Sequence, residues 1–374
     1  MISIIKQNIF SNLKNIPGWR TDRKVVIIEC DDWGGIRMPT KAAYHKLLSA
    51  GISVDKSRYN KYDTLADKED LERLFEVLCG VKDKNGKAAI MTAVCNVANP
   101  DFEKIRQSEF SEYHYEPMTK TLDRYGRHPD TFRLWQEGIK NGIFVPESHG
   151  REHITVQLWM QKLREGDKNV RLAFDHEFVS VDTVGIPQPA RQFRPEFFYD
   201  NNTHREFLEK SIVDGVNLFS ILFNYRPTVF VPSNGIFHPD LEKTLVKTGV
   251  PFLYTALFDK IYNSNGTTSR KFHTLGQKSK SGLRYYIRNC AFEPTDIDFK
   301  GIEYTLSQIK AAFNWSKPAI ISTHRVNFIG GISVKNRDTG LHELKKLLNA
   351  IIKMWPDVEF MSSSELFKVI GQKS

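Results

Sequence analysis

Short apolar runs recur along the chain, and most of them are separated by stretches with the spacing of amphipathic helices. The runs are residues 25–30, 88–95, 143–146, 228–232, 252–255, 285–292, 319–323 and 358–361. The helical stretches are residues 68–78, 131–140, 203–219, 239–247, 299–313 and 340–354. Several runs are continuous rather than alternating, as expected for parallel strands that are covered on both faces. Strands that alternate with helices predict βα units, and therefore a parallel sheet or barrel.

Four long segments without a clear pattern lie between these elements, at residues 51–66, 96–130, 166–202 and 260–283. Loops of that length in a compact protein usually carry function or close over a site. No proline- or serine-rich linker divides the 374 residues, and no internal repeat is visible. We therefore expect a single α/β domain over residues 1–374, with a core from about 25 to 370 and the last three long segments as insertions.

The composition narrows the class of protein. Hydrophobic residues make up 40% and charged residues 26%, which excludes a disordered, collagen-like or coiled-coil chain. Because this many apolar residues can form a core without disulfides or structural metals, we expect any bound metal to serve chemistry rather than folding. The net charge of +9 is small for this length, so we expect no nucleic-acid partner. The densest basic cluster, residues 271–280, indicates a solvated loop, with an anionic substrate as the alternative.

The sequence also bears on location. No segment approaches the roughly 18 apolar residues that a membrane-spanning helix requires. The first twenty residues lack the uninterrupted apolar stretch of a signal peptide. We therefore expect a cytoplasmic protein without a membrane span. None of the four cysteines forms a C-x-x-C pair, which predicts free thiols. The oligomeric state is left open.

The first apolar run ends in two adjacent carboxylates, Asp31 and Asp32, which are followed by Trp33 and two glycines. Successive side chains of a strand point to opposite sides. The two acids can therefore do different jobs, one holding a metal and the other managing a proton. The alternative is a turn in which an aspartate caps the chain before the glycines.

A pair of histidines, His149 and His153, follows the run at residues 143–146. Histidines four residues apart fall on one face of a helical turn and can chelate one ion. Two histidines on a helix surface are the alternative. Glu152 stands next to the second histidine, which differs from the order of the H-E-x-x-H zinc proteases. His176 lies between two acids, but no regular spacing supports a second metal site there.

A third polar group closes the run at residues 319–323, where His324 is followed by Arg325 and Asn327. Active sites of parallel βα barrels lie at the carboxyl ends of the strands. The acids, the histidine pair and His324 all occupy such positions, on three separate strands. One fold would therefore bring them to one rim.

This order of elements resembles the polysaccharide deacetylase family, the NodB-homology group known as carbohydrate esterase family four. The resemblance covers about residues 25–370 and consists of the two aspartates, the His-x-x-x-His pair, a proline-containing strand end and the late histidine. It implies a distorted (β/α) barrel, often of seven parallel strands. It also implies one divalent metal and the removal of acetyl groups from N-acetylated, or occasionally O-acetylated, sugars.

The resemblance assigns roles residue by residue. It makes Asp31 the catalytic base and Asp32, His149 and His153 the metal ligands. The segment Phe-Val-Pro-Ser-Asn-Gly at residues 230–235 stands where the family has Phe-Arg-Pro-Pro-Tyr-Gly. Ser233 and Asn234 are therefore expected at the substrate, with the backbone amide of Asn234 binding the oxyanion. His324 matches the general acid. Apart from the resemblance, Trp33 could stack on a sugar face or pack in the core. Arg325 and Asn327 are further candidates for substrate contact.

Two departures from the family pattern stand out. The arginine of the third motif, which orients the base in the family, is replaced here by Val231, and Arg151 or Arg325 could substitute for it. The sequence around Arg194 is similar to the third motif, but it lies before the helix that should precede this motif in the chain. The usual first motif ends in glycine where this chain has Trp33. These changes indicate a divergent member.

The chemistry of the candidate residues is consistent with this expectation. Two imidazoles and one carboxylate leave positions open on a metal, which suits Zn²⁺ first and also Fe²⁺, Co²⁺, Ni²⁺ or Mn²⁺. A histidine as acid favours N-deacetylation over O-deacetylation, because an amine needs a proton to leave. The sequence thus predicts a metal-dependent sugar deacetylase. The alternatives are a catalytically impaired glycan-binding protein on the same barrel, and a metal-dependent hydrolase of another glycan bond.

Overall fold

The computed structural model describes residues 10–125, 130–186 and 188–372. Residues 1–9 of the stretch used above to argue against a signal peptide therefore lie outside the described residues, as do small parts of the first two insertions. Within the described ranges, no helix combines the length and the apolar character needed to cross a membrane.

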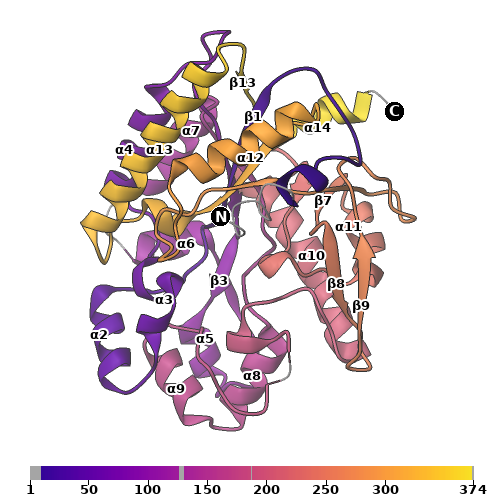
Figure 1. The fold of residues 1–374 in the computed structure, drawn as a ribbon. Helices are drawn as coiled ribbons and strands as arrows, with labels where there is room; N and C mark the ends of the chain where they lie inside the picture. Colours follow the sequence, from indigo (N-terminus) through magenta and orange to yellow (C-terminus); the bar gives the residue numbers. More distant parts are fainter. Residues whose placement is uncertain (1–9, 126–129, 187, 373–374) are drawn as a thin grey trace.

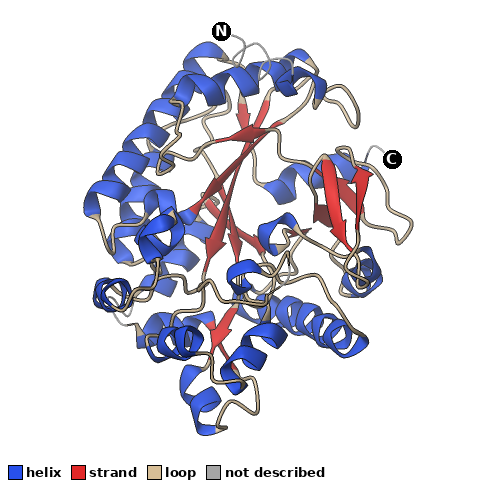
Figure 2. Cartoon of the chain, turned by 60° about the horizontal axis from the view of Figure 1, so that its bottom comes forward, coloured by secondary structure: helices blue, strands red, loops and turns tan. Residues whose placement is uncertain are grey.

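The centre of the molecule is a curled parallel sheet in the strand order β10-β7-β6-β5-β2-β1-β12-β11. Its strands are β1 Val25–Trp33, β2 Met91–Cys95, β5 Phe144–Ser148, β6 Val229–Phe230, β7 Phe252–Tyr254, β10 Arg284–Tyr286, β11 Cys290–Ala291 and β12 Ala319–His324. A short strand, β13 Glu359–Phe360, pairs with the start of β1. Figure 2 shows these strands surrounded by helices. The predicted distorted (β/α) barrel is confirmed.

The barrel is not closed, because its two outermost strands, β10 and β11, do not pair with each other. They are consecutive in the chain and are separated only by residues 287–289. The sequence pattern predicts one strand at residues 285–292, and the structure divides this run into two. This division gives eight strands along the main path instead of about seven.

Helices cover the outer face of the sheet. They are α4 Lys68–Cys79, α7 Thr131–Lys140, α10 Asn202–Phe223, α11 Glu242–Lys247, α12 Ile302–Asn314 and α13 Val334–Met354. Figure 1 shows α4, α7, α12 and α13 side by side on one flank. The outer face of β1 packs Val26, Ile28 and Cys30 into the main core beneath them. Burying about 100 Å² of such apolar surface stabilises the fold by roughly 2.5 kcal/mol.

The inner face of the barrel has its own apolar layer, in which Val25 and Ile27 meet Leu366 and Phe367 of the last helix. This helix, α14 Ser363–Gln372, lies against the amino-terminal end of β1, since Ser363 donates a hydrogen bond to buried Glu29. The alternation along β1 therefore sends residues 25, 27, 29 and 31 inward. Apolar side chains occupy the first two of these positions, and acids occupy the last two.

The long segments and the stretches beside them contain more regular structure than the sequence pattern predicts. The elements in or overlapping the long segments are α3 Arg58–Tyr62, α5 Phe102–Gln107, α6 Met118–Arg124, α9 Lys168–Asp175 and the antiparallel pairs β3 Ala98–Pro100 with β4 Tyr115–Pro117 and β8 Phe258–Tyr262 with β9 Thr268–Phe272. Two helices beside them are α2 Lys41–Ser49 and α8 Val156–Arg164. Short 3₁₀ turns are η1 Val54–Lys56, η2 Arg191–Phe193, η3 Ser233–Gly235, η4 Pro239–Leu241 and η5 Arg325–Phe328. A second core that includes Leu47, Trp159 and Phe174 joins α2, α8 and α9. These helices lie together at the lower end of Figure 1.

Candidate metal centre and catalytic cavity

Three strand ends bring the predicted polar residues to one rim. Asp31 on β1 lies beside His324 on β12 in the strand register, and the Nε2 atom of His324 is 3.9 Å from an oxygen of Asp31. The loop after β5 carries His149 and His153 to the same rim. All four of these residues, together with Asp32, line one cavity of about 690 Å³.

The backbone adopts a left-handed conformation at Asp32, and this conformation decides where the side chains of Asp31 and Asp32 point. Asp32 has a φ angle of 73°, and the pairing of β1 with β2 shifts register between Cys30 and Trp33. Few residues other than glycine adopt such an angle, although aspartate tolerates it better than most. Simple alternation predicts Asp31 and Asp32 on opposite sides, but the turn places both of them in the cavity. It also sends the next side chain, Trp33, into the outer core.

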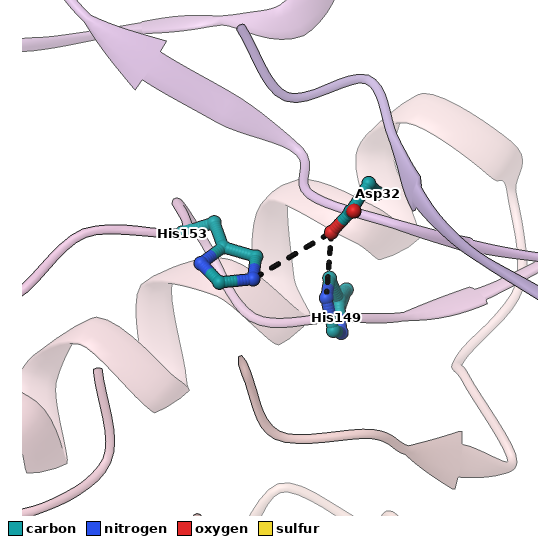
Figure 3. A group of neighbouring side chains, drawn as sticks. All are labelled: Asp32, His149 and His153. Carbon is teal, nitrogen blue, oxygen red and sulfur yellow. Dashed lines mark ion pairs between the residues drawn. The ribbon is translucent and has the colours of Figure 1, made fainter. Parts of the chain in front are cut away.

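Asp32, His149 and His153 form the candidate metal site (Figure 3). Their ligand atoms all lie within 4.8 Å of one another, and all three side chains are buried. The Nε2 atoms of His149 and His153 lie 3.4 Å and 3.5 Å from the same oxygen of Asp32. Among the described residues, no other group of histidine, cysteine or acid side chains has this arrangement. His176, considered above for a second site, is therefore not part of such a cluster.

The hydrogen bonds of the two histidines test whether a cation fits here. The Nδ1 atom of His149 lies 2.7 Å from the carbonyl oxygen of Val231, and that of His153 lies 2.8 Å from the carbonyl oxygen of Arg194. A carbonyl can only accept, so each Nδ1 carries a proton, and Nε2 is the ring nitrogen that faces Asp32 and can bind a cation. Three electron-pair donors that converge in a buried place fit a divalent cation.

Ionisation in the site agrees with this fit. Burial lowers the pKa of His153 well below its usual value, and the positive charge of Arg194 lowers it further. Burial raises the pKa of Asp32, but the neighbouring histidines His149, His153 and His324 outweigh burial and hold that pKa well below its usual value. A neutral imidazole and an ionised carboxylate are the forms that bind a metal.

The loop that carries the two histidines is irregular, although the spacing predicts a helical turn. His149 and His153 precede α8 and have no helical assignment. Gly150, between them, has a φ angle of 93°, and a Cβ atom there would lie 2.8 Å from the ring of Phe197. A glycine is therefore required for the tight turn that lets both imidazoles face Asp32.

Arg288 holds the carboxylate of Asp31. Its two terminal nitrogens donate to the two oxygens of Asp31 at 2.6 Å and 2.7 Å, and its Nε atom donates to Glu29 at 2.6 Å. The side chain projects from the gap between β10 and β11, and its guanidinium lies 4.6 Å from the ring centre of Tyr254. Such two-pronged contacts fix the plane of a carboxylate.

The arginine contact therefore comes from a place that the sequence analysis did not consider. Arg151 is bound to Glu152 and Asp214, and Arg325 is bound to Asp63, so neither substitutes for the residue missing at position 231. The available signal was a charged residue inside the apolar run 285–292. A buried charge in a strand requires a partner, and the strand-end acids were the obvious candidates.

Glu293 holds His324 in a similar way. The Nδ1 atom of His324 donates to Glu293 at 2.6 Å, which leaves Nε2 facing the cavity. Asn327 donates from its amide to the other oxygen of Glu293 at 2.8 Å and fixes that carboxylate in turn. Burial lowers the pKa of His324, but the charge and hydrogen bond of Glu293 outweigh burial and raise it to about 9. Glu293 directly follows a predicted strand, which was the signal missed in the sequence.

The remaining predicted contact residues are placed differently from one another. Asn234 lies on the cavity in a left-handed conformation with a φ angle of 54°. Ser233 is buried beside it, and its hydroxyl accepts a hydrogen bond from the backbone of Glu196. Arg325 and Asn327 are also buried, at 1% and 0% exposed, and do not line the cavity. Asn234 is therefore the one of these four residues that a substrate can touch.

Trp33 packs in the core and does not line the cavity, although the sequence offers it as a candidate for substrate contact. It is 1% exposed, and its ring packs edge-on against Trp135 and Phe144 in the outer core. The left-handed turn at Asp32 reverses the alternation and directs the next side chain away from the cavity. A tryptophan in this position contributes to packing rather than to binding.

Segments between the strands form the walls of the cavity. The segment at residues 188–195 contributes one wall, Ser57 and Tyr59 contribute another, and Tyr262 reaches it from β8. The expectation that the long segments close over a site agrees with this arrangement. Two arginines, Arg37 and Arg194, also line the cavity and are only 8% and 6% exposed.

Comparisons with known proteins return similar structures but no similar sequences. No family model and no curated protein matches the chain. A Mycobacterium smegmatis protein named as a polysaccharide deacetylase aligns at 10% identity and a TM-score of 0.49, over 96% of this chain and 93% of its own. A 4-alpha-glucanotransferase from Thermococcus litoralis aligns at 13% identity and a TM-score of 0.47, over 92% of this chain.

An allantoinase aligns at 11% identity and a TM-score of 0.42, over 92% of this chain and 89% of its own. The chain spans only 40% of the length of the glucanotransferase. Similarity at these levels says nothing about activity. The fold and the site together define a distorted (β/α) barrel with a candidate centre for one metal ion at the carboxyl ends of its strands.

Proposed function

We propose that this protein is a metal-dependent hydrolase that removes acetyl groups from N-acetylated sugars. One observation carries the proposal. Beside the three converging ligands, Asp31 and His324 face each other at a distance of 3.9 Å. Arg288 holds the carboxylate of Asp31, and Glu293 holds the imidazole of His324. Hydrolysis of an amide needs a base for the attacking water and an acid for the leaving amine.

Asp31 is the proposed base. Arg288 occupies both of its oxygens and fixes the carboxylate at the cavity floor, where a remaining lone pair can accept the proton of an attacking water. A divalent ion held by Asp32, His149 and His153 would polarise the acetyl carbonyl and acidify water at that place. The proposed donor to the developing oxyanion is the backbone amide of Asn234, which lies on the same cavity.

His324 is the proposed acid. A pKa of about 9 keeps its imidazole protonated near neutral pH, and Glu293 fixes the ring so that Nε2 faces the cavity. Nε2 would give its proton to the departing amine. The need for this proton favours an N-acetyl over an O-acetyl substrate. The alternative of an impaired binding protein rested on the arginine missing at position 231, and Arg288 now supplies that contact.

The proposal is tested by incubating the purified protein with N-acetylglucosamine, its oligomers and O-acetylated sugars, and by measuring released acetate. We expect release from an N-acetylated sugar, loss of release with a metal chelator, and recovery when Zn²⁺ or another divalent ion is restored. Acetate release that is unaffected by complete metal removal would contradict the proposed role of the three ligands.

Substitution of Glu293→Gln should move the pH dependence of acetate release. His324 acts as an acid only while protonated, so the rate should fall as pH rises through about 9. Without the carboxylate, the pKa of His324 should fall toward 6.5, and the loss of activity should begin at a correspondingly lower pH. A profile of kcat against pH measures this shift. An unchanged alkaline limb in an otherwise active variant would exclude His324 as the acid.

The imidazole of His324 also contributes to the free energy of unfolding, in a direction that its pKa shift defines. The pKa of His324 is raised on folding, so its contribution is complete below pH 6.5 and is lost as pH rises through about 9. In Glu293→Gln this pH-dependent contribution of His324 should disappear. Measurements of the free energy of unfolding at pH 6 and pH 9.5 can detect its loss.

A further inference from the structure

One charged side chain of the cavity has no hydrogen-bond or ion-pair partner in the part of the chain that the structure describes. The guanidinium of Arg194 takes part in no hydrogen bond or ion pair with the described residues, and its Nε atom is completely buried. The residue is 6% exposed, and what remains accessible faces the cavity. A buried guanidinium without a partner costs several kcal/mol, so residues of this kind are normally paired.

The charges around Arg194 do not remove this imbalance, because a second arginine opposes the effect of the acids Asp32 and Asp63. Arg37, also buried and on the same cavity, donates only to the neutral amide of Asn60. Its positive charge lies near enough to act on Arg194. The acids at the rim are already engaged, since Arg288 holds Asp31 and the histidines surround Asp32. A divalent ion at the candidate metal site would add further positive charge.

The shape of the group indicates which ligand would restore the balance. A guanidinium presents a planar fork of N–H donors that matches the oxygens of a phosphate or a carboxylate. The backbone of Arg194 meanwhile holds His153 through its carbonyl oxygen, and the charge of its guanidinium acts on His153 and Asp32, so the fork lies near the candidate metal site. A ligand group bound by Arg194 would therefore be close to the reacting acetyl group.

We propose that the cavity takes an anionic substrate, in which a phosphate or carboxylate near the acetylated position binds to Arg194. This inference rests on the proposed function for the identity of the reaction, but the anion site can be tested without turnover. Neutral acetylated sugars would leave the guanidinium unpaired and should bind more weakly.

The first experiment measures anion binding to the metal-loaded protein by calorimetry, with inorganic phosphate and acetate as probes. We expect at least one of them to bind, and Arg194→Met to weaken that binding about tenfold or more, the value of one charge-assisted hydrogen bond. The backbone carbonyl that holds His153 is unchanged by this substitution. Arg171→Met is the matched control, because Arg171 donates to a backbone carbonyl outside the cavity.

The melting temperature separates a binding role from a structural one. Removing an unpartnered buried charge should leave Arg194→Met as stable as the unmodified protein, or more stable, while the stabilisation by the anion disappears. Arg194→Lys, which keeps the charge, should retain part of the binding. Equal anion affinity in the unmodified protein and Arg194→Met, or no binding of either probe, would overturn the proposal.

The second experiment compares N-acetylglucosamine 1-phosphate, N-acetylmuramic acid and N-acetylglucosamine for binding and for acetate release. Preference for the first or the second distinguishes a phosphate from a carboxylate. Arg194-dependent anion binding without acetate release from any sugar would leave the anion site in place and count against the deacetylase. Acetate release from the neutral sugar, with equal affinity for all three, would support the deacetylase and overturn the anion site.

Discussion

The variant His149→Ala/His153→Ala should contain almost no bound metal, whereas the unmodified protein should hold about one divalent ion per chain. Two of three converging ligands are lost, and Asp32 alone offers a single carboxylate. Elemental mass spectrometry of the purified protein measures the ratio. We also expect the rise in melting temperature on adding Zn²⁺ to disappear, because a ligand stabilises only the state that binds it.

A matched control uses a buried histidine elsewhere. His204 is 2% exposed and its Nδ1 atom contacts Asp200, and neither residue lines the catalytic cavity. His204→Ala should keep the metal even if it lowers the melting temperature. Full metal content in the double variant would contradict the assignment of the site, whatever the effect on activity.

The second large effect is expected for Asp31→Asn, which should retain the metal and lose acetate release by about 10²- to 10⁴-fold. Asparagine keeps the size of the side chain but cannot accept the proton of the attacking water. Turnover and metal content measured on the same preparation separate the two functions. Because Asp31 is not among the converging ligands, the metal ratio should stay near that of the unmodified protein.

Asp296→Asn provides the comparison for Asp31→Asn. Asp296 pairs with Arg58 near the cavity but does not line it, so its loss should leave turnover nearly unchanged. A similar reduction in both variants would indicate a general electrostatic effect. Loss of metal in Asp31→Asn alone would instead make Asp31 a ligand and would remove it as the proposed base.

The strand pattern and the rim residues were accessible from the sequence because each rests on a local signal. Continuous apolar runs identify buried parallel strands, and polar residues at their ends are conspicuous. Asp31, His149 and His324 follow from this rule alone. Their convergence needs only the property that parallel strands end at the same edge.

The predictions from the sequence fail where the backbone departs from regular strand geometry. The positive φ angle of Asp32 reverses the alternation of β1, and so Trp33 lies in the core although the pattern places it at the site. The opening of the barrel at residues 287–289 allows Arg288 to reach Asp31. The spacing of apolar residues in the sequence does not indicate where a barrel opens. The arginine missing at position 231 is replaced by Arg288, which lies in the connection between β10 and β11.

The place of β1 in the sheet has a consequence for how the chain folds. In the sequence β1 comes before the other described strands, yet it lies between β2 and β12, and Val26 pairs with Ala319. During synthesis one edge of this apolar strand must therefore stay unpaired until β12 has been made. Contacts between such distant residues slow folding, and open edges promote aggregation. The strand that carries both acids is thus made well before it can be enclosed.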